Sequence, residues 1–138
     1  MTGIHMCPDV DTVAGPDTLD EIHHAFAHCW RRYPEIRDDV RIQMELAATE
    51  IAANIIEHSA PGRPVRVQMH LEVSADEIRA TFHDDGNPVQ VNLDTVQMPS
   101  VLAERGRGLA IAVGILDALS YRRGTDMNNW TLTRSLHR

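Results

Sequence analysis

Residues 42–59 read IQMELAATEIAANIIEHS and form the most informative segment of the chain. Placed on a helix at about 100° per residue, its apolar side chains form one stripe that would face a core. The stripe consists of Met44, Ala47, Ile51 and Ile55, together with Val40, which lies two residues before the quoted segment. Glu50, Asn54 and His58 follow at four-residue intervals along its edge, so they share one side of the helix.

Two explanations fit these three polar side chains. An amide and a carboxylate beside a buried face cost free energy unless a partner satisfies them, which favours a bound ligand or ion. The alternative is an ordinary amphipathic helix with a polar boundary. The helix alone does not separate the two explanations, so the other motifs have to decide.

Length and charge limit the classes of protein to consider. The 138 residues suit a single domain, residues 1–138, with residues 1–16 as an N-terminal arm or edge strand. The 13 Lys and Arg against 20 Asp and Glu give a net charge of −7, which argues against nucleic acid as the main partner. No apolar run approaches the roughly 18 residues of a membrane span. Cys7 and Cys29 form no metal-ligand array and no signal peptide precedes them, which predicts reduced thiols and a cytoplasmic location.

The first third of the chain predicts a short strand and a helix. Val10–Val13 is the candidate edge strand, and a helix is expected from Asp17 to the stop at Tyr33-Pro34. His24 and His28 on that helix have the i, i+4 spacing of a two-histidine metal site, but no third ligand accompanies them. We therefore expect a solvated or partner-facing surface there, with zinc as the alternative.

The middle of the chain predicts a β-hairpin that ends in a carboxylate. Val65–Val73 alternates apolar and polar residues, and Ile78–His83 does so again after a turn. The inward parity of the second strand continues to Asp84, and Gly86 and Pro88 then turn the backbone. This places a carboxylate on the apolar side of the sheet, whereas the alternative interpretation is a solvated turn.

The last third contains a glycine-rich motif before an apolar run. Arg105-Gly106-Arg107-Gly108 leads into Leu109–Leu116, which predicts a buried helix that begins after the glycines. Backbone N–H groups and the dipole at such a helix start favour phosphate. Two strands are expected to follow, Ala118–Arg122 and Trp130–Leu136, joined by a polar turn.

Taken in order, the three motifs resemble the nucleotide-binding boxes of the GHKL ATPase superfamily. Within it, the chain is most similar to the anti-sigma factor serine/threonine kinases of bacterial partner-switching systems. The first box, E-x-x-x-N-x-x-x-H, corresponds to Glu50, Asn54 and His58; the second, D-x-G-x-P, to Asp84, Gly86 and Pro88; the third is GRGL, Gly106 to Leu109. The order and the expected elements of the motifs make the combination more specific than any single one.

The resemblance implies a role for each site residue. Asp84 would accept a hydrogen bond from the exocyclic amine of adenine, Asn54 would orient Mg²⁺ on the triphosphate of ATP, and Glu50 would be the catalytic base. Residues 106–109 would lie along the phosphates, and Arg105 would reach the terminal phosphate or a protein partner. His58 would hold the end of its helix.

One departure affects the adenine site. Many relatives carry a glycine-threonine pair before the last strand, with the threonine near adenine. Here Asn128 and Asn129 stand at that place, and Thr131 is the nearest hydroxyl. Thr131 is therefore the candidate for the second adenine contact, although it does not stand at the position where those relatives carry their threonine.

The expected fold is α+β, a two-layer sandwich of a mixed, mostly antiparallel sheet with about three helices on one face, the Bergerat ATP-binding fold. The resemblance implies a Mg-ATP-dependent kinase that phosphorylates a STAS-domain anti-anti-sigma partner and binds a sigma factor or another regulated target. It also implies a homodimer, and the exposed first helix and the strand edge are the expected protein contacts. The alternatives are a nucleotide-binding switch module without kinase activity and a detached histidine-kinase catalytic domain. The chain begins at Met1 without a phosphoacceptor helix, which disfavours the latter.

Overall fold

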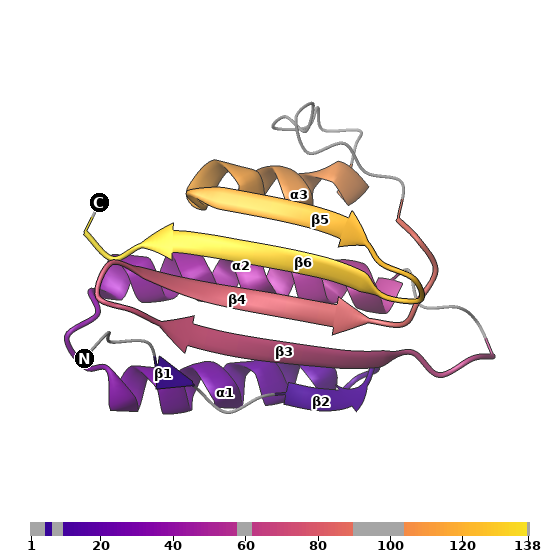
Figure 1. The fold of residues 1–138 in the computed structure, drawn as a ribbon, viewed down its shortest axis with the longest axis horizontal. Coiled ribbons are helices and arrows are strands. Elements are labelled where there is room, and N and C mark those ends of the chain that lie inside the picture. The colour runs from indigo at the N-terminus through magenta and orange to yellow at the C-terminus, as the bar shows by residue number, and fades with distance from the viewer. Residues whose placement is uncertain (1–4, 7–9, 58–61, 90–103, 138) are drawn as a thin grey trace.

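The chain folds into one sheet with helices packed on one of its faces (Figure 1). The computed structural model describes residues 5–6, 10–57, 62–89 and 104–137, of which residues 5–6 and 104–108 by their backbone alone. The helices are α1 Thr18–Arg32, α2 Asp38–Glu57 and α3 Glu104–Ile115. The strands are β1 His5–Met6, β2 Val10–Val13, β3 Arg66–Val73, β4 Glu77–Asp84, β5 Ala118–Arg123 and β6 Asn128–Ser135.

The strand order is β1-β3-β4-β6-β5, and β2 also pairs with β3. β1 and β2 lie one after the other along the same edge of β3, opposite residues 72–73 and 66–69 respectively. Every pairing between described strands is antiparallel. The predicted α+β, two-layer architecture is thus confirmed, but the expected parallel component is not found among these strands. Short turns connect β3 to β4 and β5 to β6, and such turns join only antiparallel neighbours.

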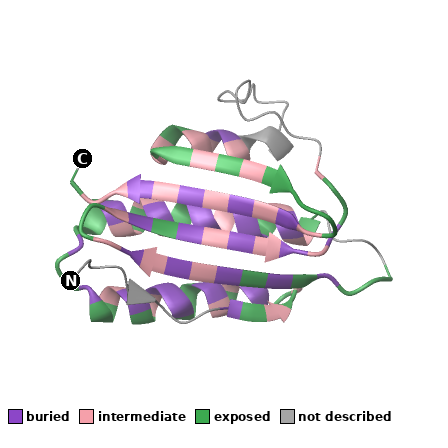
Figure 2. Ribbon diagram, in the orientation of Figure 1, coloured by how far each residue is buried: buried purple, intermediate pink, exposed green. Residues whose placement is uncertain are grey.

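The core lies between the sheet and the helices, as the burial pattern shows (Figure 2). Alternate residues of the central strands point into it: Val67, Met69, Leu71, Ile78, Ala80, Phe82, Trp130 and Leu132. The apolar stripe predicted for the central helix faces them, and its five members are all at most 4% exposed. Full burial of one large side chain of this kind contributes about 1.5–3 kcal/mol, so this interface is the main stabilising element of the fold.

α2 begins two residues before its apolar stripe, whereas α3 begins earlier than predicted. α2 starts at Asp38, where Asp38 and Asp39 place negative charge at the positive end of the helix dipole. Asp39 Oδ1 also accepts a hydrogen bond from the Val40 N–H at 2.9 Å. α3 starts at Glu104 rather than after the glycine motif, although each glycine in a helix is about 1 kcal/mol less favourable than alanine. Gly106 and Gly108 therefore lie inside the first turns of α3.

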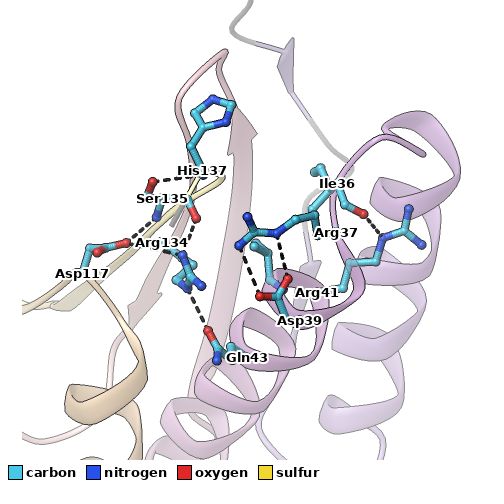
Figure 3. A network of polar contacts seen from close by, with 10 residues as sticks. Ile36, Arg37, Asp39, Arg41, Gln43, Asp117, Arg134, Ser135 and His137 are labelled. Carbon is cyan, nitrogen blue, oxygen red and sulfur yellow. Dashed lines mark hydrogen bonds and ion pairs between the residues drawn. The ribbon is translucent and has the colours of Figure 1, made fainter.

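A polar network ties the beginning of α2 to the end of β6 (Figure 3). Arg134, which is only 7% exposed, donates from Nε to Gln43 Oε1 at 2.9 Å and from Nη1 to the Ser135 carbonyl at 2.5 Å. Asp117 accepts a hydrogen bond from the Ser135 N–H and lies 3.9 Å from Arg134 Nη1. These contacts fix where α2 crosses the sheet.

Two further sequence predictions concern thiols and membranes. Cys29 is buried and forms no disulfide with another described residue, and Cys7 lies outside the described residues. Among the described residues, no helix combines the length and the apolar composition that a membrane crossing requires.

Candidate functional site

Four element ends gather at one end of the molecule (Figure 1). α2 and β4 end there, and α3 and β6 begin there. The structure places residues of all three predicted motifs on these elements: Glu50 and Asn54 on α2, Asp84 as the last residue of β4, and the glycine motif in the first turns of α3. Segments far apart in sequence therefore meet at one place.

Asp84 occupies the position that strand parity predicts. It is 3% exposed and lies on the helix-covered face, paired with Val67 of β3 and Asn128 of β6. Its Oδ1 accepts hydrogen bonds from the Gly86 N–H at 3.0 Å and from Asn128 Nδ2 at 2.9 Å. The alternative interpretation of a solvated turn is therefore wrong for the carboxylate itself.

The turn that follows Asp84 is held on both sides. On the β3 side, the Arg66 N–H donates to Asp85 Oδ1 at 2.8 Å, and Arg63 Nη2 donates to the Asp85 carbonyl at 2.8 Å. On the β5 side, Arg123 Nη1 donates to the Gly86 carbonyl at 2.8 Å. These bonds give the D-x-G turn a fixed conformation and hold the carboxylate in place.

Little space is left for a side chain at Gly86. A Cβ at this position would meet Asp84 Oδ1 at 3.0 Å and Val65 Cγ1 at 3.5 Å. The first distance is too short for an unstrained contact, so a side chain here would displace the carboxylate or the turn. The close approach of the Asp84 carboxylate therefore favours glycine in this turn.

The second oxygen of Asp84 differs from the first in its hydrogen bonding. Oδ2 is buried and makes no hydrogen bond within the described part of the chain. Burial raises the pKa of Asp84, the hydrogen bonds from Asn128 and Gly86 lower it in part, and the negative charge of Asp85 adds to the rise. A buried acceptor without a donor is unfavourable by about 1–3 kcal/mol, and a ligand N–H at this atom would remove that penalty.

Asn54 and Glu50 lie on the side of α2 that faces α3. Gln43 lies seven residues before Glu50 and eleven before Asn54, so all three side chains share one side of α2. Gln43 lines a cavity of about 400 Å³ together with Gly114 and Leu116 near the end of α3. The two helices run in opposite directions (Figure 1). Gln43, near the start of α2, faces the end of α3. Asn54, on the same side of α2 but near its end, therefore faces the start of α3.

The amide of Asn54 is the second unpartnered group of the site. Its Nδ2 is buried without a hydrogen-bond partner among the described residues, while the residue as a whole is partly exposed, as is Glu50. The two ends of an amide exchange by a rotation of the side chain, so this position can present an oxygen to a ligand. The predicted placement beside the buried stripe is confirmed for both residues.

The donor set of this site fits Mg²⁺ bound through a ligand better than a metal bound by protein alone. Within the described residues, no three His, Cys, Asp or Glu side chains lie close enough together to hold an ion. Mg²⁺ commonly takes only one or two protein oxygens and completes its shell with phosphates and water. Asn54 is the residue that would supply such an oxygen. The zinc alternative for His24 and His28, both exposed on α1, gains no third ligand from the described residues.

The glycine motif is placed by its backbone. α3 is twelve residues long and its first turns contain the motif, so the free N–H groups and positive dipole end of the helix lie at this end of the molecule. Leu109 is partly buried against the core. The side chains of Arg105 and Arg107, and the whole of His58, lie outside the described residues.

Thr131 is not brought to the site. It pairs with Thr81, three residues along β6 from Asn128, on the face of the sheet away from the helices. Asn128 instead lies opposite Asp84 and is 1% exposed. The signal was present in the alternation of β6, because Asn128 shares the parity of Trp130, but the strand was predicted to begin only at Trp130.

A second surface feature lies apart from these residues. A groove of about 560 Å³ runs between α1 and α2 and is lined by Trp30, Ile42 and Leu46 among others. Ile42 is 67% and Leu46 41% exposed, and Glu45 between them accepts hydrogen bonds from Trp30 Nε1 and His23 Nδ1. None of the predicted nucleotide-binding residues lines this groove. The buried atoms Asp84 Oδ2 and Asn54 Nδ2, which lack hydrogen-bond partners among the described residues, belong to the other site, so we do not assign this groove to a nucleotide.

Comparison with known proteins agrees with this geometry. Residues 12–134 match the family model described as "Histidine kinase-like ATPase domain". No curated protein sequence matches the chain. Among solved structures, the histidine kinase domain of the blue-light activated histidine kinase EL346 from Erythrobacter litoralis is similar, with a TM-score of 0.56 and 15% identity. The match covers 89% of this chain and 64% of that one, so the chain spans less than two thirds of its length.

A second similar structure is the histidine kinase AdeS from Acinetobacter baumannii. Its TM-score is 0.53 and its identity 12%, over 94% of this chain and 68% of that chain. At these identities the likeness establishes the fold alone.

Proposed function

The chain belongs to the histidine kinase-like ATPase domain family, and from this premise we propose that it binds Mg-ATP and transfers phosphate to a protein serine or threonine. The substrate would be a small STAS-domain partner in a bacterial partner-switching system. A sigma factor or another regulated protein would be the second partner, and the chain would act as a homodimer. The resemblance of the three motifs to the anti-sigma factor kinases supports this narrower assignment.

One observation carries the nucleotide proposal. Two polar groups, Asp84 Oδ2 and Asn54 Nδ2, are buried and have no hydrogen-bond partner in the described part of the chain, and both belong to elements that end at the same side of the molecule. Adenine would satisfy Asp84 Oδ2 with its exocyclic N–H, and the start of α3 would face the phosphates. Bound Mg²⁺ would neutralise charge on the triphosphate, with the amide of Asn54 as its protein ligand.

Glu50 is the proposed base. It lies one turn before Asn54 on the same side of α2, which puts a carboxylate beside the amide that would hold the metal. It would take the proton of the substrate hydroxyl as that oxygen bonds to the terminal phosphorus, while the bond to the leaving ADP oxygen breaks. The amide that would hold the metal and the carboxylate that would accept the proton are then on a single helix.

The α1–α2 groove supports a protein contact on the first two helices. Its exposed Ile42 and Leu46 form an apolar strip of the kind that protein partners cover. We assign this strip to the STAS partner, in line with the expectation that the first helix is a contact surface. Glu50 and Asn54 share α2 with this strip, but neither they nor Asp84 line the groove, so the STAS partner and the nucleotide would bind at separate surfaces.

The test is a transfer assay with purified chain, Mg-ATP and the STAS partner. We expect phosphoserine or phosphothreonine on the partner, and Glu50→Gln should reduce the rate by about 10² to 10⁴-fold with nearly unchanged ATP affinity. Glu72→Gln is the matched control, because Glu72 lies on the uncovered face of the sheet and should leave the rate unchanged. ATP binding without transfer to any partner would contradict the kinase and favour a switch module; phosphohistidine formation would favour a histidine-kinase domain.

A further inference from the structure

The side chain of Asn128 makes more hydrogen bonds than any other amide near the candidate site. Its Nδ2 donates to Asp84 Oδ1 and to the Asn87 carbonyl, each at 2.9 Å. Its Oδ1 accepts from Arg123 Nη1 at 3.2 Å and from the Tyr121 hydroxyl. Both N–H groups and both lone pairs are therefore used, which is the full capacity of an amide.

The orientation of this amide is fixed by its partners. Arg123 can only donate hydrogen bonds and the Asn87 carbonyl can only accept them, so a flipped Asn128 would lose both contacts. The nitrogen must then face Asp84. Because Asp84 Oδ1 already accepts from the Gly86 N–H and now from Asn128, that oxygen has no place for a proton or for a ligand donor.

We propose that Asn128 is a positioning residue that orients Asp84 so that Oδ2, and not Oδ1, is the oxygen that meets the purine. This inference rests on the proposed nucleotide function and adds the cause of base selectivity. A purine with an exocyclic N–H donor at that position is accepted, whereas a purine that presents a carbonyl oxygen there meets a second acceptor. Asn128 itself contacts the carboxylate and the turn, and not the base.

The same network reaches the strand beside β6. The Tyr121 hydroxyl donates to Asn128 and accepts the Val89 N–H at 2.9 Å. The ring of Tyr121 packs against Trp130 with a centroid distance of 4.6 Å. The orientation of Asp84 thus depends on β5 through Tyr121 and Arg123, two residues to which neither composition nor motif assigns a role.

The experiment measures the ratio of dissociation constants for GDP and ADP by calorimetry on the purified chain with Mg²⁺. Asn128→Ala frees the Asp84 carboxyl to rotate and to hold a proton on either oxygen, so the preference for ADP should fall by about tenfold. Asn129→Ala is the control: it is the neighbouring residue of the same type, it faces the other side of the sheet and it also loses hydrogen bonds, to His83 and to the Arg122 carbonyl. Its ratio should stay within about twofold of the unmodified chain.

A second variant keeps the inference testable if Asn128→Ala does not fold. Tyr121→Phe retains the ring contact with Trp130 and removes only the hydroxyl, so it should lower the ratio by a smaller factor. Equal losses of ADP and GDP affinity, or an unchanged ratio in the folded variants, would overturn the positioning role. Failure of the unmodified chain to bind ADP would instead refute the proposed function, and this inference with it.

Discussion

The substitution Asp84→Asn separates binding from stability at the centre of the site. The amide is close in shape to the carboxylate, so an oxygen in the Oδ1 position can still accept from the Gly86 N–H and from Asn128 Nδ2. The change falls on Oδ2, which becomes a donor. In the free protein Oδ2 has no partner among the described residues, so the variant loses no hydrogen bond there.

The expected loss of adenine affinity follows from one hydrogen bond. A hydrogen bond to a charged group is worth about 1.5–3 kcal/mol, and its loss corresponds to a roughly 10- to 150-fold rise in the dissociation constant for ADP. GDP should be affected less or bind more tightly, because its carbonyl oxygen can accept from the introduced amide. Calorimetric titration of both nucleotides measures the two effects separately.

The stability of the nucleotide-free variant should change in the opposite sense. Burial raises the pKa of Asp84 above its ordinary 3.8, so the folded state favours the protonated form. The stability contributed by this group is fully present below pH 3.8 and is lost as pH rises through the raised pKa. The Asp84→Asn variant has no carboxyl group to ionise at this position and so keeps its stability as pH rises. Its free energy of unfolding should equal or exceed that of the unmodified chain at neutral pH.

Urea denaturation across a pH series tests this prediction. The difference in unfolding free energy between Asp84→Asn and the unmodified chain should grow as pH rises through the raised pKa and then level off. ADP affinity of the unmodified chain should fall at low pH, since a protonated carboxyl cannot accept the amine. A variant that is strongly destabilised at neutral pH, or that weakens ADP and GDP equally, would refute the reasoning.

Three further perturbations test other parts of the structure. Gly86→Ala should lower the free energy of unfolding by about 1–3 kcal/mol in urea and weaken ADP binding, because its Cβ would meet Asp84 Oδ1 at 3.0 Å; unchanged values would contradict the tight turn. Ile42→Asp should abolish binding of the STAS partner by calorimetry and leave ADP affinity intact, whereas Val13→Asp, 57% exposed on β2, should affect neither. Arg134→Met should leave Gln43 without its donor and lower the unfolding free energy by about 1–3 kcal/mol, with little effect on the ratio of GDP to ADP affinity.

Local sequence patterns predicted those features that depend only on strand and helix periodicity. The parity of β4 placed Asp84 inward, because side chains alternate between faces and the apolar face was evident from Phe82 and Ala80. The 3.6-residue period likewise placed Asn54 at the edge of the buried stripe of α2. In both cases the apolar residues identified the buried face of the strand or helix, and the position of the polar residue relative to that face followed from the period.

Features that depend on pairing between distant segments were not accessible. Asn128 contacts Asp84 across 44 residues of sequence, and Arg134 contacts Gln43 across 91. Neither contact leaves a trace in a local pattern, because the register of β4 against β6 sets the first and the crossing of α2 over the sheet sets the second. The start of α3 was placed too late since two glycines weigh against a helix locally, while the packing of Leu109, Ala112 and Ile115 against the core favours the helix.

A crystal structure of the chain with Mg²⁺ and a non-hydrolysable ATP analogue tests the convergence of the three motifs most directly. It should show the exocyclic amine within about 3 Å of Asp84 Oδ2, the side-chain oxygen of Asn54 on the metal, and the phosphates at the first turn of α3. A nucleotide bound elsewhere, for example against Trp30 in the α1–α2 groove, with Asp84 Oδ2 still unpartnered, would contradict the account.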